Sequence, residues 1–420
     1  MRIEAAPIDA LYDRALTTLR LVDFPASRVV VIRATVRDDL GHHWESFAEF
    51  TTNPQGQVDL ALAAPSGGTY RVADAMGLFW SMQLDPAVET RGPFVKTNPD
   101  PVVVTIAAEL DGKPTARIQL TRRFLADHIV RGDLDDPSLV GAFFHHASER
   151  RPGIILLGGS GGGMSIEHPA LLASQGFAVL SLAYFAMPGL PQDLAEIPLE
   201  YFERAIGWMR KHRAVRPGPL AVIGASRGGE LALLLGATFP EITAVVGYVP
   251  SGVGWAGIKT TGGPAGSAWT YRKNPIRFVR TEPTDLSAWD KKPVALTPTF
   301  LSQMTDPAEL DYAAIAVENI NGPILMFSGT DDQMWPSLNL ADLAIQRLIA
   351  RDFKHPYEHI SYAGAGHFIR FPYSPTISEI FHPVVKTPMA LGGAPENNHI
   401  ANLDSWQKCL AFLRRHLGAA

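Results

Sequence analysis

The sequence predicts an all-β domain followed by an α/β domain with a mostly parallel sheet. Three observations support this prediction. The first ~120 residues contain short strand-like runs separated by turns. From about Gly132, strand-like runs alternate with helix-like runs. Within that second region, a glycine-rich turn joins an apolar strand to a helix at residues 220–231. We expect the two domains to span residues 1–125 and 126–420, since a chain of 420 residues can bury two cores.

The first region predicts an immunoglobulin-like β-sandwich. Asp111-Gly112 joins two of its runs, and both residues tolerate the positive φ angles of a tight hairpin turn. The expected strands are Arg28–Val36, Trp44–Thr51, Val58–Leu62, Tyr70–Val72, Leu78–Leu84, Val102–Glu109 and Ala116–Leu120. No group of chemically reactive residues stands out here, so we expect a structural or substrate-shaping domain.

The second region predicts a parallel sheet covered by helices on both faces. The expected strands are Gly153–Leu157, Ala178–Ala183, Leu220–Ile223, Ile242–Tyr248, Ile324–Phe327 and Tyr357–Tyr362. The expected helices include Pro169–Ser174, Leu199–Lys211 and Leu340–Arg351.

A nucleophilic serine is predicted at Ser226, in the sequence Gly224-Ala225-Ser226-Arg227-Gly228. A strand precedes this turn and a helix follows it, as in the nucleophile elbow of α/β-hydrolases. Small residues two positions before and after the serine are needed because the turn is tight. The second domain is therefore predicted to be an α/β-hydrolase.

A serine nucleophile needs a base and an orienting acid, which follow it in the order Ser, acid, His in this fold. Strand 324–327 leads into a loop that carries Asp331 and Asp332, and Asp332 is preferred because it lies further from the strand. The other aspartate is expected to cap the loop. His367 follows a strand and a tight turn, whereas the rival His399 lacks that setting.

The loop Gly158–Gly163 predicts an oxyanion hole. No Gly-Lys-Ser/Thr follows it and its glycines do not match G-x-G-x-x-G, so it is neither a Walker loop nor a dinucleotide fingerprint. Glycines let the backbone approach a substrate and leave N–H groups to face a developing negative charge. We expect one donor from the region of Gly159 and Ser160 and the other from the backbone N–H of Arg227.

Residues 251–322 interrupt the alternation of strands and helices and predict a cap-like insertion over the substrate pocket. The segment contains Trp255, Trp269 and Trp289. Large indole rings are usually buried, so the insertion is expected to pack rather than to form a surface loop.

Composition narrows the classes of partner, cofactor and cellular location to be expected. The net charge is -5 without any basic run, which predicts no nucleic-acid partner. A single cysteine, Cys409, allows no internal disulfide, and no cofactor or metal site is expected. No apolar run reaches the ~18 residues of a membrane span, and the N-terminal residues do not resemble a signal peptide. A cytoplasmic protein is expected.

Several motifs in the same order resemble the family of type-I acyl-CoA thioesterases and bile acid-CoA:amino acid N-acyltransferases, over nearly the whole chain. The motifs are residues 36–41, 76–80, 161–163, 171–178, 199–203, 366–373 and 392–395. The resemblance implies Ser226 as nucleophile, Asp332 as acid, His367 as base and a small-molecule acyl thioester of coenzyme A as substrate. The amino-acid-conjugating branch of that family uses a cysteine nucleophile, so Ser226 favours water as the acyl acceptor.

The expected activity is therefore hydrolysis of acyl-CoA to free acid and CoA. Three alternatives remain open from the sequence. The same residues could cleave an oxygen ester, a lactone or a peptide-like amide, because hydrolases of this fold change substrate by altering the cap. The acyl group could pass to an amine or an alcohol, or the chain could be a binding protein without activity.

Overall fold

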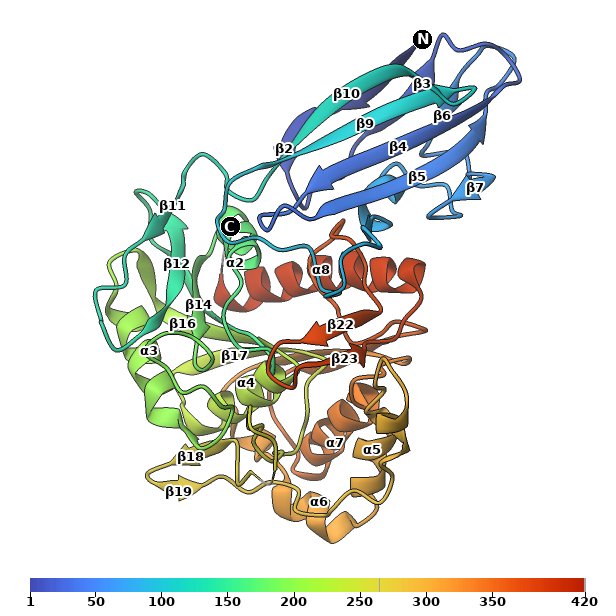
Figure 1. The fold of residues 1–420 in the computed structure, drawn as a ribbon. Helices are drawn as coiled ribbons and strands as arrows, with labels where there is room; N and C mark the ends of the chain where they lie inside the picture. The colour runs from blue at the N-terminus through green and yellow to red at the C-terminus, as the bar shows by residue number, and fades with distance from the viewer. Residues whose placement is uncertain (264, 419–420) are drawn as a thin grey trace.

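The computed structural model describes residues 1–263 and 265–418, which form an elongated β-domain and a larger α/β domain (Figure 1). The last strand of the β-domain ends at Arg123, and the first strand of the α/β domain begins at Ile129. Buried side chains of the β-domain continue into those of the α/β domain in one apolar cluster. The two parts therefore share a packed boundary.

Two sheets build the β-domain. One has the order β1-β3-β6, and the other has the order β2-β10-β9-β4-β5-β7 with β8 paired to β5. The long central strands alternate buried and less buried side chains, as expected for strands with one face on a core. The strands are β1 (Arg2–Ala6), β2 (Asp9–Leu11), β3 (Thr18–Val22), β4 (Val29–Arg37), β5 (His43–Thr51), β6 (Val58–Asp59), β7 (Gly67–Gly68), β8 (Gln83–Leu84), β9 (Val102–Leu110) and β10 (Lys113–Arg123).

Local sequence misled the prediction at two places in this domain. Tyr70–Val72 forms no strand, and a short helix α1 (Gly77–Trp80) replaces the first part of the strand expected at 78–84, of which only β8 (Gln83–Leu84) is a strand. Asp74 explains the helix, because its carboxylate accepts the backbone N–H of Met76 at 2.8 Å and the indole N–H of Trp80 at 2.7 Å. All four helical residues are buried, so their apolar run carried no periodicity that separates a helix from a strand.

An eight-stranded sheet forms the centre of the second domain, in the order β11-β12-β14-β13-β16-β17-β20-β21. The strands from β14 to β21 run parallel, whereas β11 and β12 are antiparallel. The predicted α/β-hydrolase-like domain with a mostly parallel sheet is confirmed. Its strands are β11 (Ile129–Gly132), β12 (Val140–His146), β13 (Arg151–Leu157), β14 (Ala178–Ala183), β16 (Val215–Ala225), β17 (Ile242–Tyr248), β20 (Ile324–Gly329) and β21 (Tyr357–Tyr362).

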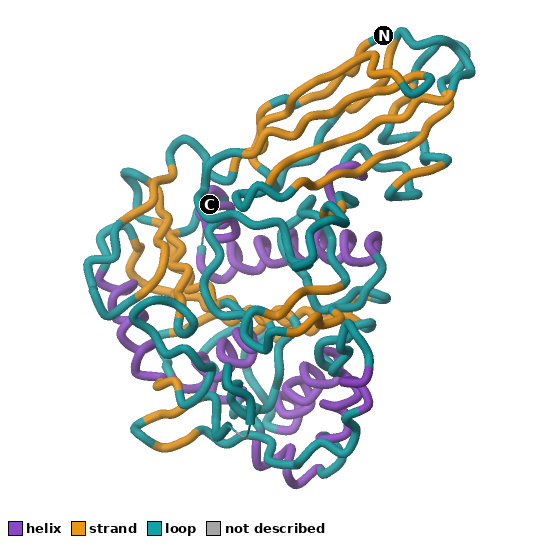
Figure 2. Tube along the Cα trace, viewed as in Figure 1, coloured by secondary structure: helices purple, strands orange, loops and turns teal. Residues whose placement is uncertain are grey.

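Helices cover both faces of this sheet (Figure 2). On the face toward the β-domain lie α2 (Glu167–Ser174) and the long α8 (Pro395–Leu417), whose buried residues belong to the same apolar cluster as the β-domain core. The opposite face carries α3 (Leu199–Lys211), α4 (Arg227–Thr238) and α7 (Ser337–Ala350), which share a second cluster. The central parallel strands such as β14, β17 and β20 are thus buried on both sides, which explains the continuous apolar runs in the sequence, whereas the edge strand β21 keeps exposed residues.

The segment between β17 and β20 forms the predicted insertion. It contains β18 (Trp269–Tyr271), β19 (Asn274–Pro275), η1 (Ser287–Asp290), α5 (Thr297–Gln303), α6 (Pro307–Ala313) and η2 (Val317–Asn319), and β15 (Ile197–Pro198) pairs with β18. Trp255 and Trp269 are buried as expected. The expectation was wrong for Trp289, which is 41% exposed, because η1 buries none of its residues.

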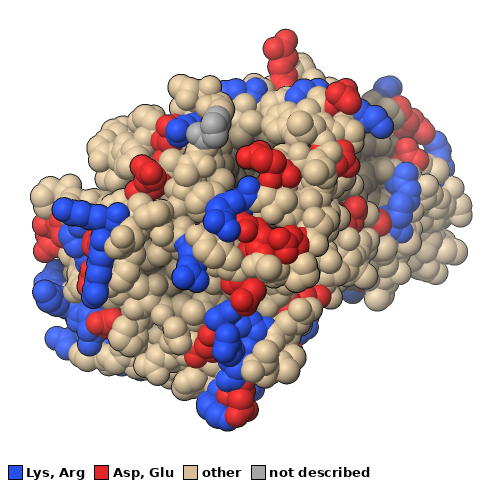
Figure 3. Space-filling model, turned by 90° about the horizontal axis from the view of Figure 1, so that it is seen from below, with Lys and Arg blue, Asp and Glu red and all other residues tan. Residues whose placement is uncertain are grey.

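Charged side chains of both signs lie beside one another on the face seen in Figure 3. Several pairs join elements of the insertion and α7, among them Arg280 with Glu309 at 2.8 Å and Arg347 with Glu318 at 2.6 Å. Within residues 1–263 and 265–418, no helix combines the length and apolar character needed to cross a membrane.

Candidate active site

The turn between β16 and α4 holds Ser226 in a strained backbone conformation, with φ 57° and ψ -122°. A side chain on Gly224 would place its Cβ 1.8 Å from the carbonyl oxygen of Gly228. A Cβ on Gly228 would lie 2.2 Å from the carbonyl oxygen of Gly158. Both contacts are far below van der Waals distance, so the predicted requirement for small residues at these positions is confirmed.

The backbone of Ser226 ties the turn to its neighbours. Its N–H donates to the carbonyl of Tyr248 in β17 at 2.8 Å, and its carbonyl accepts from Gly229 at 2.8 Å to begin α4. Arg227 is the first helical residue, and the N–H groups in a first helical turn have no partner inside the helix. The Arg227 N–H therefore has the placement expected of an oxyanion donor.

His367 and Asp332 meet at the end of the sheet. The imidazole Nδ1 of His367 lies 2.8 Å from Oδ2 and 3.0 Å from Oδ1 of Asp332, and both residues are buried. The Asp332 carboxylate also accepts the backbone N–H groups of Met334 and Trp335, at 3.0 and 3.2 Å. This arrangement fixes the carboxylate and directs the other imidazole nitrogen, Nε2, away from it.

Asp331 has a different environment. Its carboxylate accepts the backbone N–H of Gly393 at 2.9 Å and the side-chain amide of Gln333 at 3.2 Å, so it caps the loop. His399 is also elsewhere, in α8, where its ring stacks on Trp80 with centroids 4.8 Å apart. Of the two aspartates and two histidines considered from the sequence, the structure pairs Asp332 with His367.

A pocket of about 320 Å³ brings the predicted residues together. Ser226, His367, Gly159 and Ser160 all line it, and its wall is mainly apolar. Among the residues that the structure describes, the Ser226 hydroxyl forms no hydrogen bond with His367. Hydrogen bonds of this kind often tighten only when a substrate is bound. Other lining residues include Leu156, Ser165, His168, Ile223, Tyr248, Met334, Ile369, Arg370, Ile380, His382 and Pro383.

The glycine-rich loop after β13 lies directly against the elbow. A Cβ built on Gly159 would be 3.1 Å from both the Cβ of Ser226 and the carbonyl oxygen of Ala225, and 3.6 Å from the Ser226 hydroxyl oxygen. The Tyr184 hydroxyl donates to the carbonyl of Gly158 at 2.6 Å and helps to hold the loop. The loop is thus placed where a second oxyanion donor would be required.

Gly159→Ala is expected to lower kcat about 10- to 100-fold, since a misplacement near 1 Å at a reacting centre can cost that much. The new methyl group would crowd Ser226 and push the loop away from the elbow. Steady-state kinetics on an ester or thioester substrate would measure the loss. Gly207→Ala is the matched control, because a Cβ there meets nothing within 4 Å. Unchanged kcat in Gly159→Ala would contradict the placement.

His382 is not singled out by any sequence pattern. It ends strand β22 (Glu379–His382), and β22 pairs with β23 (Thr387–Ala390). Its ring nitrogen Nε2 lies 3.0 Å from the Ser160 hydroxyl oxygen. The two residues are 222 positions apart, and no motif surrounds His382, so only the folded chain brings them together.

Two histidines that line the pocket, the buried His382 and the partly buried His168, are held neutral. Burial, and to a lesser extent the neighbouring His367, lowers the pKa of His382 from 6.5 to about 4. Burial, followed by the charge of Arg370, lowers the pKa of His168 to about 3. Arg370 itself forms an ion pair with Glu167. For His382 and His168, the charged imidazole is disfavoured because it would lose its hydration.

Acid is therefore expected to destabilise the fold below pH 6.5. In the unfolded chain, His382 binds a proton near pH 6.5. In the folded chain, its pKa is about 4, so it stays neutral until the pH falls to that value. The stabilisation is fully present above pH 6.5 and is lost as the pH falls toward 4, by up to about 3 kcal/mol. Urea unfolding at pH 7 and pH 4.5 measures it. His382→Asn should show a smaller difference between the two pH values, and an equal difference would contradict the assignment.

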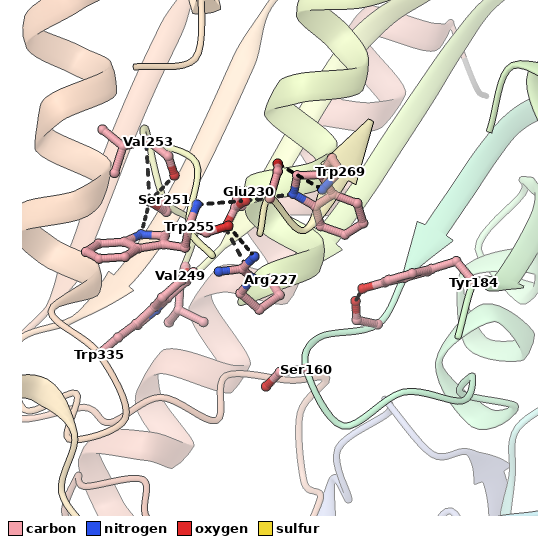
Figure 4. Close-up of polar contacts among 12 residues, drawn as sticks. Ser160, Tyr184, Arg227, Glu230, Val249, Ser251, Val253, Trp255, Trp269 and Trp335 are labelled. Carbon is pink, nitrogen blue, oxygen red and sulfur yellow. Dashed lines mark hydrogen bonds and ion pairs between the residues drawn. The ribbon is translucent and has the colours of Figure 1, made fainter. Parts of the chain in front are cut away.

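A buried ion pair attaches the insertion to the elbow helix (Figure 4). Arg227 and Glu230 approach to 3.3 Å, with side chains 5% and 0% exposed. Glu230 accepts the indole N–H of Trp269 at 2.7 Å, while Arg227 donates to the carbonyl of Trp255 at 3.1 Å. Burial raises the pKa of Glu230, and the charge of Arg227 opposes that shift. The residue that follows the serine thus connects its helix to the insertion.

A second Ser–His–Asp chain lies away from the pocket. The Ser328 hydroxyl is 2.7 Å from Nε2 of His359, whose Nδ1 is 2.9 Å from Asp342. Ser328 is fully buried in β20, and none of the three residues lines the pocket of Ser226. A substrate has no access to that hydroxyl. These hydrogen bonds therefore join β20, β21 and α7 rather than forming a reactive site.

Comparisons with known proteins bear on this site. A model described as BAAT / acyl-CoA thioester hydrolase C terminal matches residues 197–419, and one described as acyl-CoA thioester hydrolase/BAAT N-terminal region matches residues 16–136. Acyl-coenzyme A amino acid N-acyltransferase 1 of Mus musculus is 30% identical over 426 residues, or 99% of this chain and 98% of that protein. Acyl-coenzyme A thioesterase 1 of Homo sapiens is 29% identical over 407 residues, or 93% and 90%. A puromycin-hydrolyzing peptidase of Mycobacterium tuberculosis has a TM-score of 0.46 and 15% identity, covering 92% of this chain and 54% of its own.

Proposed function

The chain belongs to the acyl-CoA thioester hydrolase/BAAT family, and on that premise we propose that it hydrolyses acyl-CoA thioesters through Ser226, His367 and Asp332. The observation that carries the proposal is the pairing of His367 with Asp332 in the pocket that Ser226 lines. The identity of the nucleophile also supports it, since a serine acyl-enzyme is readily hydrolysed by water.

The proposed reaction begins with attack of the Ser226 hydroxyl oxygen on the thioester carbonyl. Nε2 of His367 takes the hydroxyl proton, while Asp332 holds Nδ1–H and stabilises the imidazolium. The oxygen that becomes negative is stabilised by the backbone N–H of Arg227 and by the loop at Gly159 and Ser160. Collapse of the tetrahedral intermediate breaks the carbon–sulfur bond, and His367 returns the proton to the departing CoA thiol.

Water completes the cycle in the second half of the reaction. His367 removes a proton from water, whose oxygen attacks the acyl-Ser226 ester. Breakdown of the second tetrahedral intermediate releases the free acid, and the proton returns to Ser226. The overall reaction converts acyl-CoA and water into free acid and CoA, and it consumes no oxidant or cofactor.

Release of free thiol from a panel of acyl-CoAs of different chain length tests the proposal. Turnover of at least one acyl-CoA, with a higher kcat/KM than that for simple aryl esters, is expected. Activity on aryl esters combined with no thiol release from any acyl-CoA would reject the CoA substrate while leaving the serine chemistry intact.

Acyl transfer to an amino acid is the second candidate, because a relative named as an amino acid N-acyltransferase matches 99% of this chain. The two activities differ only in the group that attacks the acyl-enzyme. Product analysis with a mixture of amino acids present distinguishes them. Free acid as the main product supports hydrolysis, and N-acyl amino acid as the main product supports transfer.

A further inference from the structure

Ser160 and His382 form a polar contact in the wall of the pocket that the proposed reaction does not yet use. Ser160 follows Gly159 in the loop that lies against the elbow, and both it and His382 line the pocket. His382 is 5% exposed and comes from the β22–β23 hairpin. The turn of the same hairpin supplies Pro383, whose ring would lie 3.4 Å from a Cβ on Gly161. The hairpin thus packs against the oxyanion loop.

The hydrogen bonds of His382 determine its tautomer. Nδ1 receives the backbone N–H groups of Val384 at 3.3 Å and Val385 at 3.1 Å, so this nitrogen is an acceptor and carries no hydrogen. A neutral imidazole then has its hydrogen on Nε2. Nε2–H donates to the Ser160 hydroxyl oxygen at 3.0 Å. The hydroxyl hydrogen of Ser160 is consequently not used in this contact and is available to another acceptor.

This tautomer excludes a second nucleophile. A base for Ser160 would need an unprotonated nitrogen facing its hydroxyl, and Nε2 carries the hydrogen. Protonation of His382 would also place a hydrogen on Nδ1, directly against two backbone donors. Burial and the neighbouring His367 lower the pKa of His382 to about 4, so the ring stays neutral when His367 becomes charged during catalysis.

We propose that the Ser160 hydroxyl is a side-chain donor to the oxyanion, and that His382 is the positioning residue that orients it. The inference rests on the proposed acylation of Ser226. Gly159 lies against Ser226, and Ser160 is the next residue and lines the same pocket, so its hydroxyl can add a donor to the backbone N–H groups. The hydrogen bond from His382 polarises the hydroxyl and strengthens the one it donates. The pocket then has three donors, from Arg227, the loop backbone and the Ser160 side chain.

Two substitutions at His382 separate its two contacts. His382→Asn keeps an acceptor near Nδ1 for Val384 and Val385 but removes the donor to Ser160. His382→Gln places an amide N–H near the position of Nε2 and restores that donor. We expect His382→Asn to lower kcat about 10- to 30-fold and to leave KM within about twofold. This loss in kcat is smaller than the roughly 10²- to 10³-fold loss typical when an oxyanion donor is removed, because the backbone donors remain. His382→Gln should recover most of the loss.

A double-mutant cycle with Ser160→Ala gives the decisive result. Because both residues act through one hydroxyl, His382→Asn/Ser160→Ala should be no slower than Ser160→Ala alone. Multiplicative losses, or wild-type kcat in Ser160→Ala, would overturn the proposal. Ser160→Ala also keeps the test valid if His382→Asn fails to fold.

The readout should be independent of the CoA substrate. The rate of Ser226 acylation by p-nitrophenyl acetate, followed by release of p-nitrophenol, serves this purpose in the full chain. An enzyme that reacts with this ester but not with acyl-CoA refutes the proposed substrate and leaves the Ser160 cycle interpretable. Equal acylation rates in wild type, Ser160→Ala and His382→Asn refute the donor role whatever the natural substrate is.

Discussion

Replacing Ser226 with alanine is expected to lower kcat by about 10⁴- to 10⁶-fold, close to the residual rate left by binding and the oxyanion hole alone. Alanine keeps the Cβ but removes the only atom that can form the acyl-enzyme. Single-turnover thiol release from acyl-CoA, with enzyme in excess, measures the loss. Labelling of the serine by a fluorophosphonate should disappear in the same variant.

The fold should tolerate this substitution. The Ser226 side chain forms no capping hydrogen bond with α4, and Ser and Ala face the same strain at φ 57°. The free energy of unfolding should therefore change by less than about 0.5 kcal/mol. A folded Ser226→Ala variant that still hydrolyses acyl-CoA at the wild-type rate would remove Ser226 from the mechanism.

Asp332→Asn is expected to lower kcat about 10³- to 10⁴-fold, the second-largest effect among these variants. The carboxylate accepts the Nδ1–H of His367 at 2.8 Å, and an amide that presents its NH₂ group would favour the wrong imidazole tautomer. The new amide also cannot stabilise the imidazolium by charge. Steady-state kinetics on acyl-CoA, repeated on an aryl ester, should show a similar fractional loss for both substrates.

Asp331→Asn is the matched control, one residue away. Asp331 caps the backbone N–H of Gly393 and has no contact with His367, so kcat should stay within about twofold while stability falls by about 1 kcal/mol. Thermal unfolding and kinetics on both variants separate the two effects. A larger kcat loss in Asp331→Asn than in Asp332→Asn would reverse the assignment of the acid.

The elbow was predictable because its constraint is local. Gly224, Ser226 and Gly228 lie within five consecutive residues, and the clash distances at the two glycines show why no larger side chain fits. His367 was predictable for a related reason, since a strand and a tight turn precede it. The choice between Asp331 and Asp332 was harder, because the two residues are adjacent on one loop. Only tertiary contacts determine which of the two carboxylates faces His367.

The errors lie where packing overrode local pattern. The apolar run at Gly77–Trp80 became a helix because Asp74 bonds to Met76 and Trp80. The strands β1, β2 and β3 were missed because each has only three to five residues, too few to show a clear pattern. Trp289 stayed exposed because η1 has no buried residue to pack with it.

The sequence by itself determined the fold class, and it pointed to the candidate nucleophile with its strained turn and to the candidate base, because each depends on residues adjacent in the chain. Tertiary structure decided which aspartate meets His367, and it alone joined Ser160 to His382 across 222 positions. The difference has a physical cause. A tight turn is specified by sterics over a few residues, whereas a hydrogen bond between distant segments exists only after the sheet and its hairpin have packed together.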